Sequence, residues 1–387
     1  MAGLFLSRSN RLESLAQELA ALLKASPLPP LHTEQIVVQS RGMATWLRQR
    51  LAAANQVCFD TAFPFPKSHT QTLFKTALGG AIPKSSPFDL ERLPWRIAAL
   101  LPEMLRHEDA ADLKRYVDEK PHPLKAFQVA QQIASSFDRY LAHRPEKLRE
   151  WERGTPTDWQ SRLWKLLSQQ TPEGSPLALI AKFQHQLQTA PNCLSSLPHR
   201  FCVFGATALP QSYLELLKIA ATQLEIHLFV VSPTDAYWGD LLSAREAAYL
   251  AKRSPAAAVH AELAHPLLAS WGRTGRAFCD ALLDLQPVQE TDSFLAPESD
   301  TILHRLQADL FAAIPPSADE TLPVPFPDRA DDSLRVHCCH SPVRELEVLQ
   351  NQLLHWFNED PSLQPKDILV TMPDVSAYAP FIEAVFG

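Results

Sequence analysis

The chain has 387 residues, of which 46 % are hydrophobic and 20 % are charged, and its formal net charge at pH 7 is −7. This length is enough for two or more domains with packed cores, and it excludes a small disulfide-stabilised peptide. The negative charge argues against a protein that coats nucleic acid through its overall field. It leaves open a single channel lined with Arg and Lys.

No apolar run approaches the roughly 20 residues that a membrane-spanning helix needs, and the N-terminus lacks the charged, apolar and small-residue regions of a secretory signal. The six cysteines are scattered without a CxxC pair, which is typical of reduced thiols in a cytosolic protein. We therefore expect a soluble cytoplasmic protein that does not contact membranes.

The chain opens with two successive β-α units. Residues 3–7 predict a first strand, Asn10 with Glu13 three residues later predicts a helix cap, and leucines at helical spacing follow. Residues 35–38 predict a short buried strand, and the apolar spacing over 43–51 predicts a second helix. Successive β-α units favour a parallel sheet covered by helices.

Further along, helical periodicity replaces the strand signals until buried strands return at 201–204 and 226–231. Residues 286–333 are rich in Pro and acids, and two more strands are predicted at 334–339 and 368–372, each followed by a helix. Because the second group of strands has few partners, we expect a fragment of a longer protein. The predicted fold class is α/β, with a first lobe split between 1–68 and 196–285, a helical insertion at 69–195, a Pro-rich crossing segment or linker at 286–333, and the truncated start of a second α/β lobe at 334–387.

The turn after the first strand lacks the chemistry of a nucleotide site. A P-loop needs a Gly-rich turn whose N–H groups face phosphate, with a Lys and a Ser or Thr for phosphate and Mg²⁺. The turn Ser7-Arg8-Ser9-Asn10-Arg11 has neither Gly nor Lys, and the strand at 201–204 continues into Gly205-Ala206-Thr207 where a Mg²⁺-binding acid would stand. We therefore predict that this chain does not hydrolyse ATP. Arg8 and Arg11 either contact phosphate or lie at a solvated helix start.

No other motif predicts catalysis or metal binding. The run His337-Cys338-Cys339-His340 has zinc-ligand types, but successive side chains of a strand point to opposite faces and cannot converge on one ion. We expect Val336 and Cys338 to face the core instead, with His337 and Cys339 on the other side. The sequence also has no GxSxG, HExxH or Gly-rich dinucleotide motif. We predict no catalytic residue, no metal and no cofactor.

Two regions carry groups suited to DNA. Basic residues between Arg139 and Lys165 alternate with aromatic ones such as Phe137 and Trp164, which suits phosphate contact with base stacking. The alternative is that these aromatics form helix cores and the charges solvate outer faces. In the turn after the second strand, Gln39 and Arg41 can each bond a base edge with two groups, whereas Ser40 is explained as a helix cap.

At these residues the sequence resembles the RecC family, the gamma subunits of bacterial exodeoxyribonuclease V (RecBCD). The resemblance is carried in chain order by SNRLESLA, VQSRGMATWL, FPFP, SSFDRYLAHRP, FGATALP, HLFVVSPTDAYWGD, HPLLASWGRTGRAF, CHSPVRELEVL and DPSLQPKDILVTMPDVSAYAPFIEAVFG. It covers the chain from the first strand to the last residue and corresponds to roughly the N-terminal third of the family chain.

The resemblance implies a superfamily-one helicase-like fold that has lost its ATPase motifs. It implies a heterotrimer with RecB-like and RecD-like subunits, which use ATP and Mg²⁺, and contact with single-stranded and double-stranded DNA during double-strand break repair. RecC-like chains channel the strand ending 3′, recognise the Chi sequence that switches the complex from degradation to recombination, and support the processivity of the RecB motor.

By position, the resemblance assigns a DNA-binding Chi channel to seven residues: Gln39, Arg41, Thr45, Phe65, Gln71, Asp138 and Arg144. Arg41 and Thr45 stand where the best known members carry Thr and Gln, Gln71 replaces a Trp and Ser135 replaces an acid. Such changes alter which base edge can be hydrogen-bonded. Each altered contact changes the free energy of discrimination between bases by about 1–3 kcal/mol.

Two other functions remain as alternatives. The chain is either a pure scaffold that docks RecB and RecD without reading DNA, or an enzyme with an ATPase or nuclease activity of its own. Salt-dependent binding of single-stranded DNA separates a channel from a scaffold, and nucleotide binding by the chain would favour an enzyme.

Overall fold

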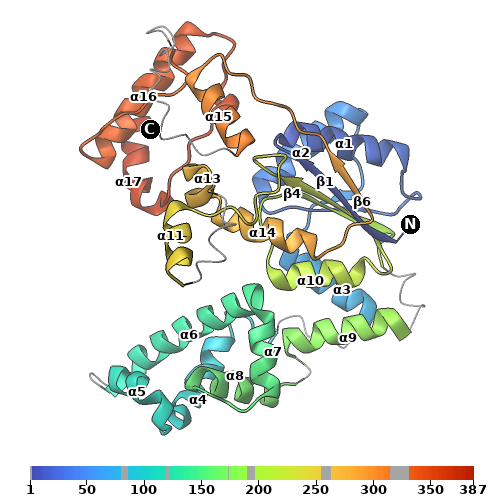
Figure 1. The fold of residues 1–387 in the computed structure, drawn as a ribbon, viewed down its shortest axis with the longest axis vertical. Coiled ribbons are helices and arrows are strands. Elements are labelled where there is room, and N and C mark those ends of the chain that lie inside the picture. Colours follow the sequence, from blue (N-terminus) through green and yellow to red (C-terminus); the bar gives the residue numbers. More distant parts are fainter. Residues whose placement is uncertain are drawn as a thin grey trace. The chain divides into compact units, whose positions relative to one another are not determined.

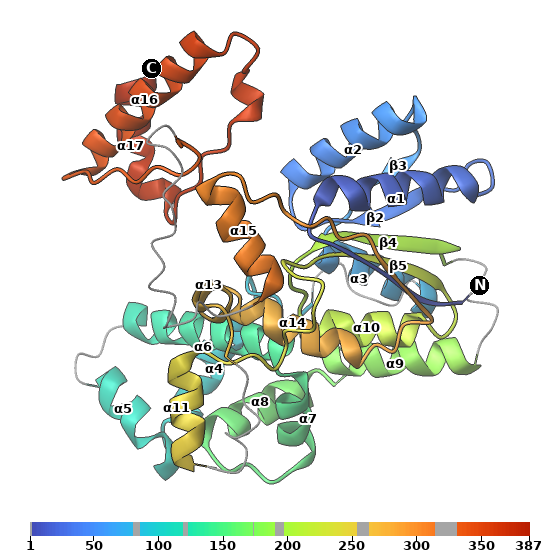
Figure 2. The ribbon, with the colours of Figure 1, turned by 45° about the horizontal axis from the view of Figure 1, so that its top comes forward.

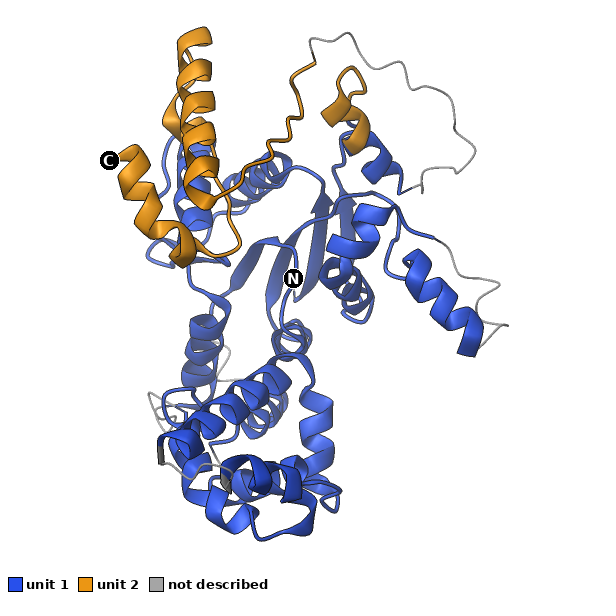
Figure 3. Cartoon of the chain, turned by 90° about the vertical axis from the view of Figure 1, so that its left-hand side faces the viewer, with its two compact units in different colours: residues 1–297, 307–319 blue, residues 298–306, 320–387 orange. Residues whose placement is uncertain are grey.

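The computed structural model describes residues 2–79, 86–118, 123–172, 174–189, 197–253, 263–313 and 331–387. The chain divides into two compact units, residues 1–297 with 307–319 and residues 298–306 with 320–387 (Figure 3). Among the described residues, no helix is both long enough and apolar enough to cross a membrane.

Unit 1 is built on a six-stranded sheet in the order β3-β2-β4-β5-β1-β6, in which every pairing is parallel (Figure 1). The strands are β1 (Gly3–Ser9), β2 (Glu34–Val37), β3 (Thr61–Ala62), β4 (Arg200–Ala206), β5 (Glu225–Val231) and β6 (Gln289–Asp292). β1 pairs with β5 on one side and with β6 on the other. The predicted α/β class with a parallel sheet is confirmed.

Helices cover both faces of this sheet (Figure 2). One face packs on α1 (Leu12–Ala25) and α2 (Arg41–Asn55) through buried residues such as Leu19 and Leu47. The other face packs on α3 (Pro66–Leu78), α9 (Pro176–Thr189), α10 (Gln211–Ala220) and α14 (Arg273–Leu283). Leucines and aromatics from these helices exclude water from both faces of the sheet. The sequences of the central strands are therefore continuously apolar and do not alternate with polar residues.

A separate helical body has its own core around Phe137 and Trp164. Its helices are α4 (Leu93–Met104), η1 (Glu108–Ala110), α5 (Ala111–Asp118), α6 (Pro123–His143), α7 (Pro145–Arg153) and α8 (Trp159–Gln170). The predicted insertion at 69–195 also included α3 and α9, but Phe74 and Phe183 from these helices pack into the core of the sheet. Helical periodicity identifies an apolar face without showing which core receives it.

Two expectations for the first lobe need correction. Residues 289–292, expected to lie in a linker, form the edge strand β6, which pairs with β1. The polar sequence of this segment does not indicate a strand. Asn10 does not cap α1. Arg11 holds the cap position without a side-chain bond, while the Asn10 amide exchanges hydrogen bonds of 2.8 and 3.0 Å with the backbone of Leu295. Three further helices of the described residues follow β5, namely α11 (Ala244–Arg253), α13 (Pro266–Trp271) and α15 (Ile302–Ala312).

In unit 2, α16 (Pro342–Glu359) packs on α17 (Val375–Phe386), as predicted, with η3 (Pro365–Asp367) between them. The strands predicted at 334–339 and 368–372 are not formed, because neither segment has a paired strand among the described residues. The expected facing is also reversed. Val336 and Cys338 are exposed, whereas His337 and Cys339 line a groove against α16.

Candidate nucleic-acid interface

The carboxyl ends of the parallel strands bring the second β-α turn beside two other loops. Gln39 follows β2 and is exposed, and its Nε2 donates to the carbonyl of Ala208, in the loop after β4. The backbone N–H of Val38 donates to the carbonyl of Pro64 at 3.1 Å, which places the end of β2 beside the start of α3. Because Nε2 carries two hydrogens, Gln39 keeps a second N–H and its Oε1 for a ligand.

The first turn of α2 displays a cation. Ser40 caps the helix by accepting from the backbone N–H of Met43 at 3.1 Å, so the capping interpretation of Ser40 is confirmed. Arg41 and Thr45 are both exposed one turn apart, and the Thr45 hydroxyl donates to the Arg41 carbonyl at 3.1 Å. Arg41 forms no ion pair with any described residue. A helix start with an unpaired Arg favours anionic ligands.

Phe65 and Gln71 lie on α3, next to this turn. Phe65 precedes the first residue of the helix and is partly exposed, and Gln71 is half-buried two turns later. Between them, His69 is fully buried, with its Nδ1 3.0 Å from the Tyr213 hydroxyl of α10 and its ring edge-on to Phe201. Burial lowers the pKa of His69 to about 4, so the ring is neutral and fixes α3 against the sheet.

Asp138 and Arg144 lie on the helical body, Asp138 half-buried on α6 and Arg144 exposed between α6 and α7. No hydrogen bond joins either side chain to a described residue of the β2–α2 turn. The helical body contacts the sheet lobe through α6 on α10 and through Arg149, which holds Glu215 with two bonds of 2.5 and 2.7 Å. Burial lowers the pKa of Arg149, but the hydrogen bonds and the negative charge of Glu215 outweigh this effect, so the pKa is raised above its usual value.

The basic and aromatic residues around α6–α8 are mostly committed to the helical body. Phe137 and Trp164 are buried in its core, which confirms their interpretation as core residues. Arg162 pairs with Asp109 at 3.1 Å, and the Lys165 ammonium donates to a backbone carbonyl at 2.7 Å. Arg162 and Lys165 therefore stabilise the body and present little charge to a ligand.

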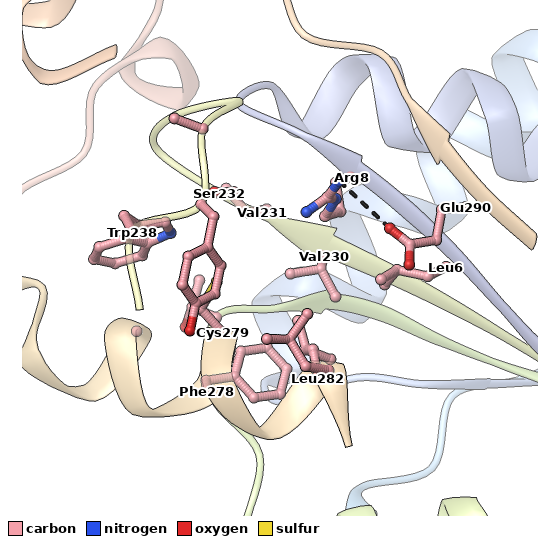
Figure 4. Close-up of a pocket in the computed structure, with 15 residues that line it drawn as sticks. Leu6, Arg8, Val230, Val231, Ser232, Trp238, Phe278, Cys279, Leu282 and Glu290 are labelled. Atoms are coloured by element: carbon pink, nitrogen blue, oxygen red, sulfur yellow. Dashed lines mark ion pairs between the residues drawn. The ribbon is translucent and has the colours of Figure 1, made fainter. Parts of the chain in front are cut away.

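The first β-α turn is occupied by the protein's own edge strand. Arg8, at the end of β1, donates to both carboxylate oxygens of Asp292 of β6 at 2.9 Å. It also lies 3.5 Å from Glu290 of the same strand (Figure 4). Burial opposes the charge of Arg8, but the bonds with Asp292 leave its pKa raised. The Ser9 hydroxyl donates to the Ser293 carbonyl at 2.8 Å. Arg8, which is half-buried, is thus held by acids of the protein itself and is not free to bind phosphate, while Arg11 is exposed.

At the end of β4, Gly205 lies in the left-handed region with φ +67°, where the pairing register with β5 shifts. A Cβ atom at this position would lie 3.3 Å from side-chain atoms of Leu12 and Met43. Glycine adopts this conformation without the steric cost that a side chain would add. The loop that follows contains Ala208, which receives the Gln39 bond.

Sequence reasoning missed three features of possible ligand or positioning value. These are the Arg8 network with β6, the buried His69, and the aromatic pair of the exposed Trp95 on α4 with Phe127 on α6. Each of these features depends on contacts between residues far apart in the sequence, and no local sequence pattern indicates such contacts. Among the described residues, one group of three potential metal ligands occurs, Glu298 with Asp300 and His304, and it is an exposed cluster of a kind that is common without an ion.

The sheet and its edge define an α/β protein in which polar side chains gather at the carboxyl ends of the strands, around a first turn bonded to the protein's own edge strand. A family profile described as "RecC, N-terminal domain" matches residues 4–313. The chain therefore belongs to the RecC N-terminal domain family.

Several relatives carry the name "RecBCD enzyme subunit RecC". The protein from Escherichia coli (strain K12) is 34 % identical over 428 residues, covering 98 % of this chain and 38 % of the relative. The one from Haemophilus influenzae is 31 % identical over 442 residues, covering 98 % and 39 %. The one from Mycolicibacterium smegmatis is 35 % identical over 397 residues, covering 99 % and 34 %. The chain thus spans well under half the length of these relatives.

Proposed function

We propose that this chain is the N-terminal part of a non-catalytic, cytoplasmic RecC-type subunit of an exodeoxyribonuclease V (RecBCD) complex that processes double-strand breaks for recombinational repair. In this proposal it assembles with RecB-like and RecD-like subunits, channels the strand ending 3′, recognises Chi and supports the processivity of the RecB motor. The family membership supports the complex, and the polar edge of the sheet supports the contact with DNA.

The observation that carries the DNA-binding role is the juxtaposition at the edge of the sheet. Gln39, Arg41 and Phe65 offer an amide, a cation and an aromatic ring from adjacent turns, joined by the bond between Val38 and Pro64. These three chemistries suit a base edge, a phosphate and a base face. Asp138 and Arg144 extend the proposed path onto the helical body.

The first β-α unit supports a helicase-like lobe that has lost nucleotide binding. The turn after β1 carries no Gly, and its Arg8 is neutralised by acids of β6. The loop after β4 has no acid at Gly205, Ala206 or Thr207. We propose that ATP and Mg²⁺ serve the partner subunits and not this chain. Titration calorimetry with Mg-ATP and this chain should then give no binding heat.

A salt series tests the DNA-binding role. Fluorescently labelled single-stranded DNA is titrated with the chain between about 50 and 200 mM salt, where each phosphate contact contributes about 0.7 to the slope of log K against log salt. We expect saturable, salt-sensitive binding, with the slope reduced by about 0.7 in Arg41→Gln and again in Arg144→Gln. Arg253→Gln, an exposed cation of α11, is the matched control. Binding that is absent, or unchanged in both variants, would reject the role.

A pure scaffold is the second candidate, and one surface favours it. Leu31 and Phe59 are 96 % and 83 % exposed, and they line a groove between the ends of α1 and α2. Leu31, Gln56 and Asp60 there have positive φ values of 68°, 67° and 49°, a strained backbone for these residue types. Exposed apolar side chains on strained turns are typical of protein contacts. Absence of saturable DNA binding would favour this candidate.

A further inference from the structure

An aromatic pair on the helical body, formed by two residues that the DNA path above does not include, leaves one of its rings exposed. Trp95 of α4 packs on the half-buried Phe127 of α6, with ring centroids 4.3 Å apart and planes tilted by 40°. The two helices pack side by side (Figure 1). Trp95 is nevertheless 66 % exposed, so the pair is held in place by α6 while much of the indole remains open to a ligand.

A polar groove begins one turn from this pair. Gln131, four residues after Phe127 and therefore on the same side of α6, lines a groove of about 660 Å³ between α5 and α6. The other lining residues are Tyr116, Lys125, Gln128, Val129, Gln132, Ser135, Ser136 and Arg139. Most of the lining is amide, hydroxyl or cation, and Val129 is its one aliphatic residue. Such a surface offers little to an apolar protein partner.

The charge of the groove is opposite to that of the chain. None of its nine lining residues is acidic, and two are cations, in a chain with 43 acids and 36 bases. Lys125 lies over the Tyr116 ring at 4.4 Å, and neither Lys125 nor Arg139 forms an ion pair with a described residue. Their separation of 14 positions along α6 corresponds to about 21 Å at 1.5 Å per residue. Two cations at that spacing, neither of them in an ion pair with a described residue and with amides between them, complement a polyanion.

We propose that Trp95 and Phe127 form a base-stacking platform for single-stranded DNA, and that Lys125 and Arg139 in the adjoining groove contact its phosphates. The proposal rests on the DNA-binding role above and adds a binding element to it. Stacking holds any base by its face, and the glutamine amides can bond base edges or sugar oxygens. Sequence-tolerant contact of this kind retains a moving strand without reading it.

The affinity of the full chain for a labelled oligothymidine tests the platform. Trp95→Ala should raise the Kd about 5- to 150-fold, because stacking on one aromatic contributes about 1–3 kcal/mol. The slope of log K against log salt should stay unchanged in this variant, since an indole carries no charge. Trp95→Phe should retain most of the affinity. Trp271→Ala, which removes an indole that is 82 % exposed on α13, is the matched control and should bind as the unmodified chain does.

Two further readouts separate stacking from loss of structure. Lys125→Gln and Arg139→Gln should each reduce the salt slope by about 0.7. An oligothymidine with one 5-iodouracil should crosslink on irradiation to Trp95 or Phe127 of the unmodified chain, as located by mass spectrometry of the peptides, without any substitution. Circular dichroism checks that the variants retain their helix content.

The outcomes distinguish this proposal from the one on which it rests. If Arg41→Gln and Arg144→Gln weaken binding while Trp95→Ala does not, and no crosslink forms on α4 or α6, the platform is wrong and the DNA path at the edge of the sheet stands. If the unmodified chain shows no saturable binding of the oligothymidine, both proposals are wrong. A crosslink on α4 or α6 with a selective loss in Trp95→Ala supports the platform.

Discussion

His69 provides a test of how the α3 helix is held in place. Its ring is buried between α3 and α10, with Nδ1 bonded to Tyr213 and Nε2 without a partner among the described residues. Burial lowers its pKa to about 4, against about 6.5 in an unfolded chain. A histidine whose folded-state pKa is depressed stabilises the fold fully above the unfolded value. That contribution is lost as the pH falls from 6.5 towards 4.

The difference of about 2.5 pKa units corresponds to about 3 kcal/mol at full protonation, and about 2 kcal/mol of this is lost by pH 5. We expect hydrogen exchange of the α3 amides, corrected for the intrinsic pH dependence, to show protection lowered about 30-fold between pH 7.5 and pH 5. His69→Phe should abolish this excess loss, because the ring no longer titrates, while His185→Gln on the exposed side of α9 should not. Equal pH dependence in His69→Phe and the unmodified chain would refute the reasoning.

Two further predictions concern packing. A double-mutant cycle of Arg149→Ala and Glu215→Ala, measured by thermal unfolding, should give a coupling energy of about 1 kcal/mol in the stability of unit 1. The reason is that this ion pair joins α7 to α10 with bonds of 2.5 and 2.7 Å. A coupling energy near zero would show that the pair does not stabilise the contact between these helices. Gly205→Ala should destabilise the chain by about 1–2 kcal/mol, owing to its φ of +67°. Gly42→Ala, within α2, adds a methyl that lies 3.9 Å from the Ser40 hydroxyl, an ordinary contact, and should instead raise the midpoint of urea unfolding; the reverse order of the two variants would contradict this.

The buried strands could be predicted from sequence because both of their faces are covered by helices. Residues 201–204 and 226–231 are continuous apolar runs, and each lies within a central strand. β6 could not be predicted, because its residues are polar and exposed and its pairing depends on Arg8, more than 280 positions earlier. The segments 334–339 and 368–372 have strand-like patterns but no ladder partner among the described residues, and a pattern alone does not make a strand.

The candidate site shows the same division. Gln39 and Arg41 could be located at the edge of the sheet because a strand and a capped helix flank them. The pair of Trp95 and Phe127 could not be located, because helical spacing does not show which aromatic of an amphipathic helix stays exposed. Phe137 and Trp164 have the same residue chemistry and are buried in the core.

The most direct test of the central claim is a comparison of two activities in an assembled RecBCD-type enzyme that carries Gln39→Ala or Arg144→Ala in the full-length subunit. Duplex unwinding and the Chi-dependent attenuation of nuclease activity are measured on the same substrate, with and without a Chi site. If these residues line the path of the strand ending 3′, the response to Chi falls by a much larger factor than the unwinding rate. Equal loss of both activities, or an intact Chi response in both variants, would contradict that placement of the DNA.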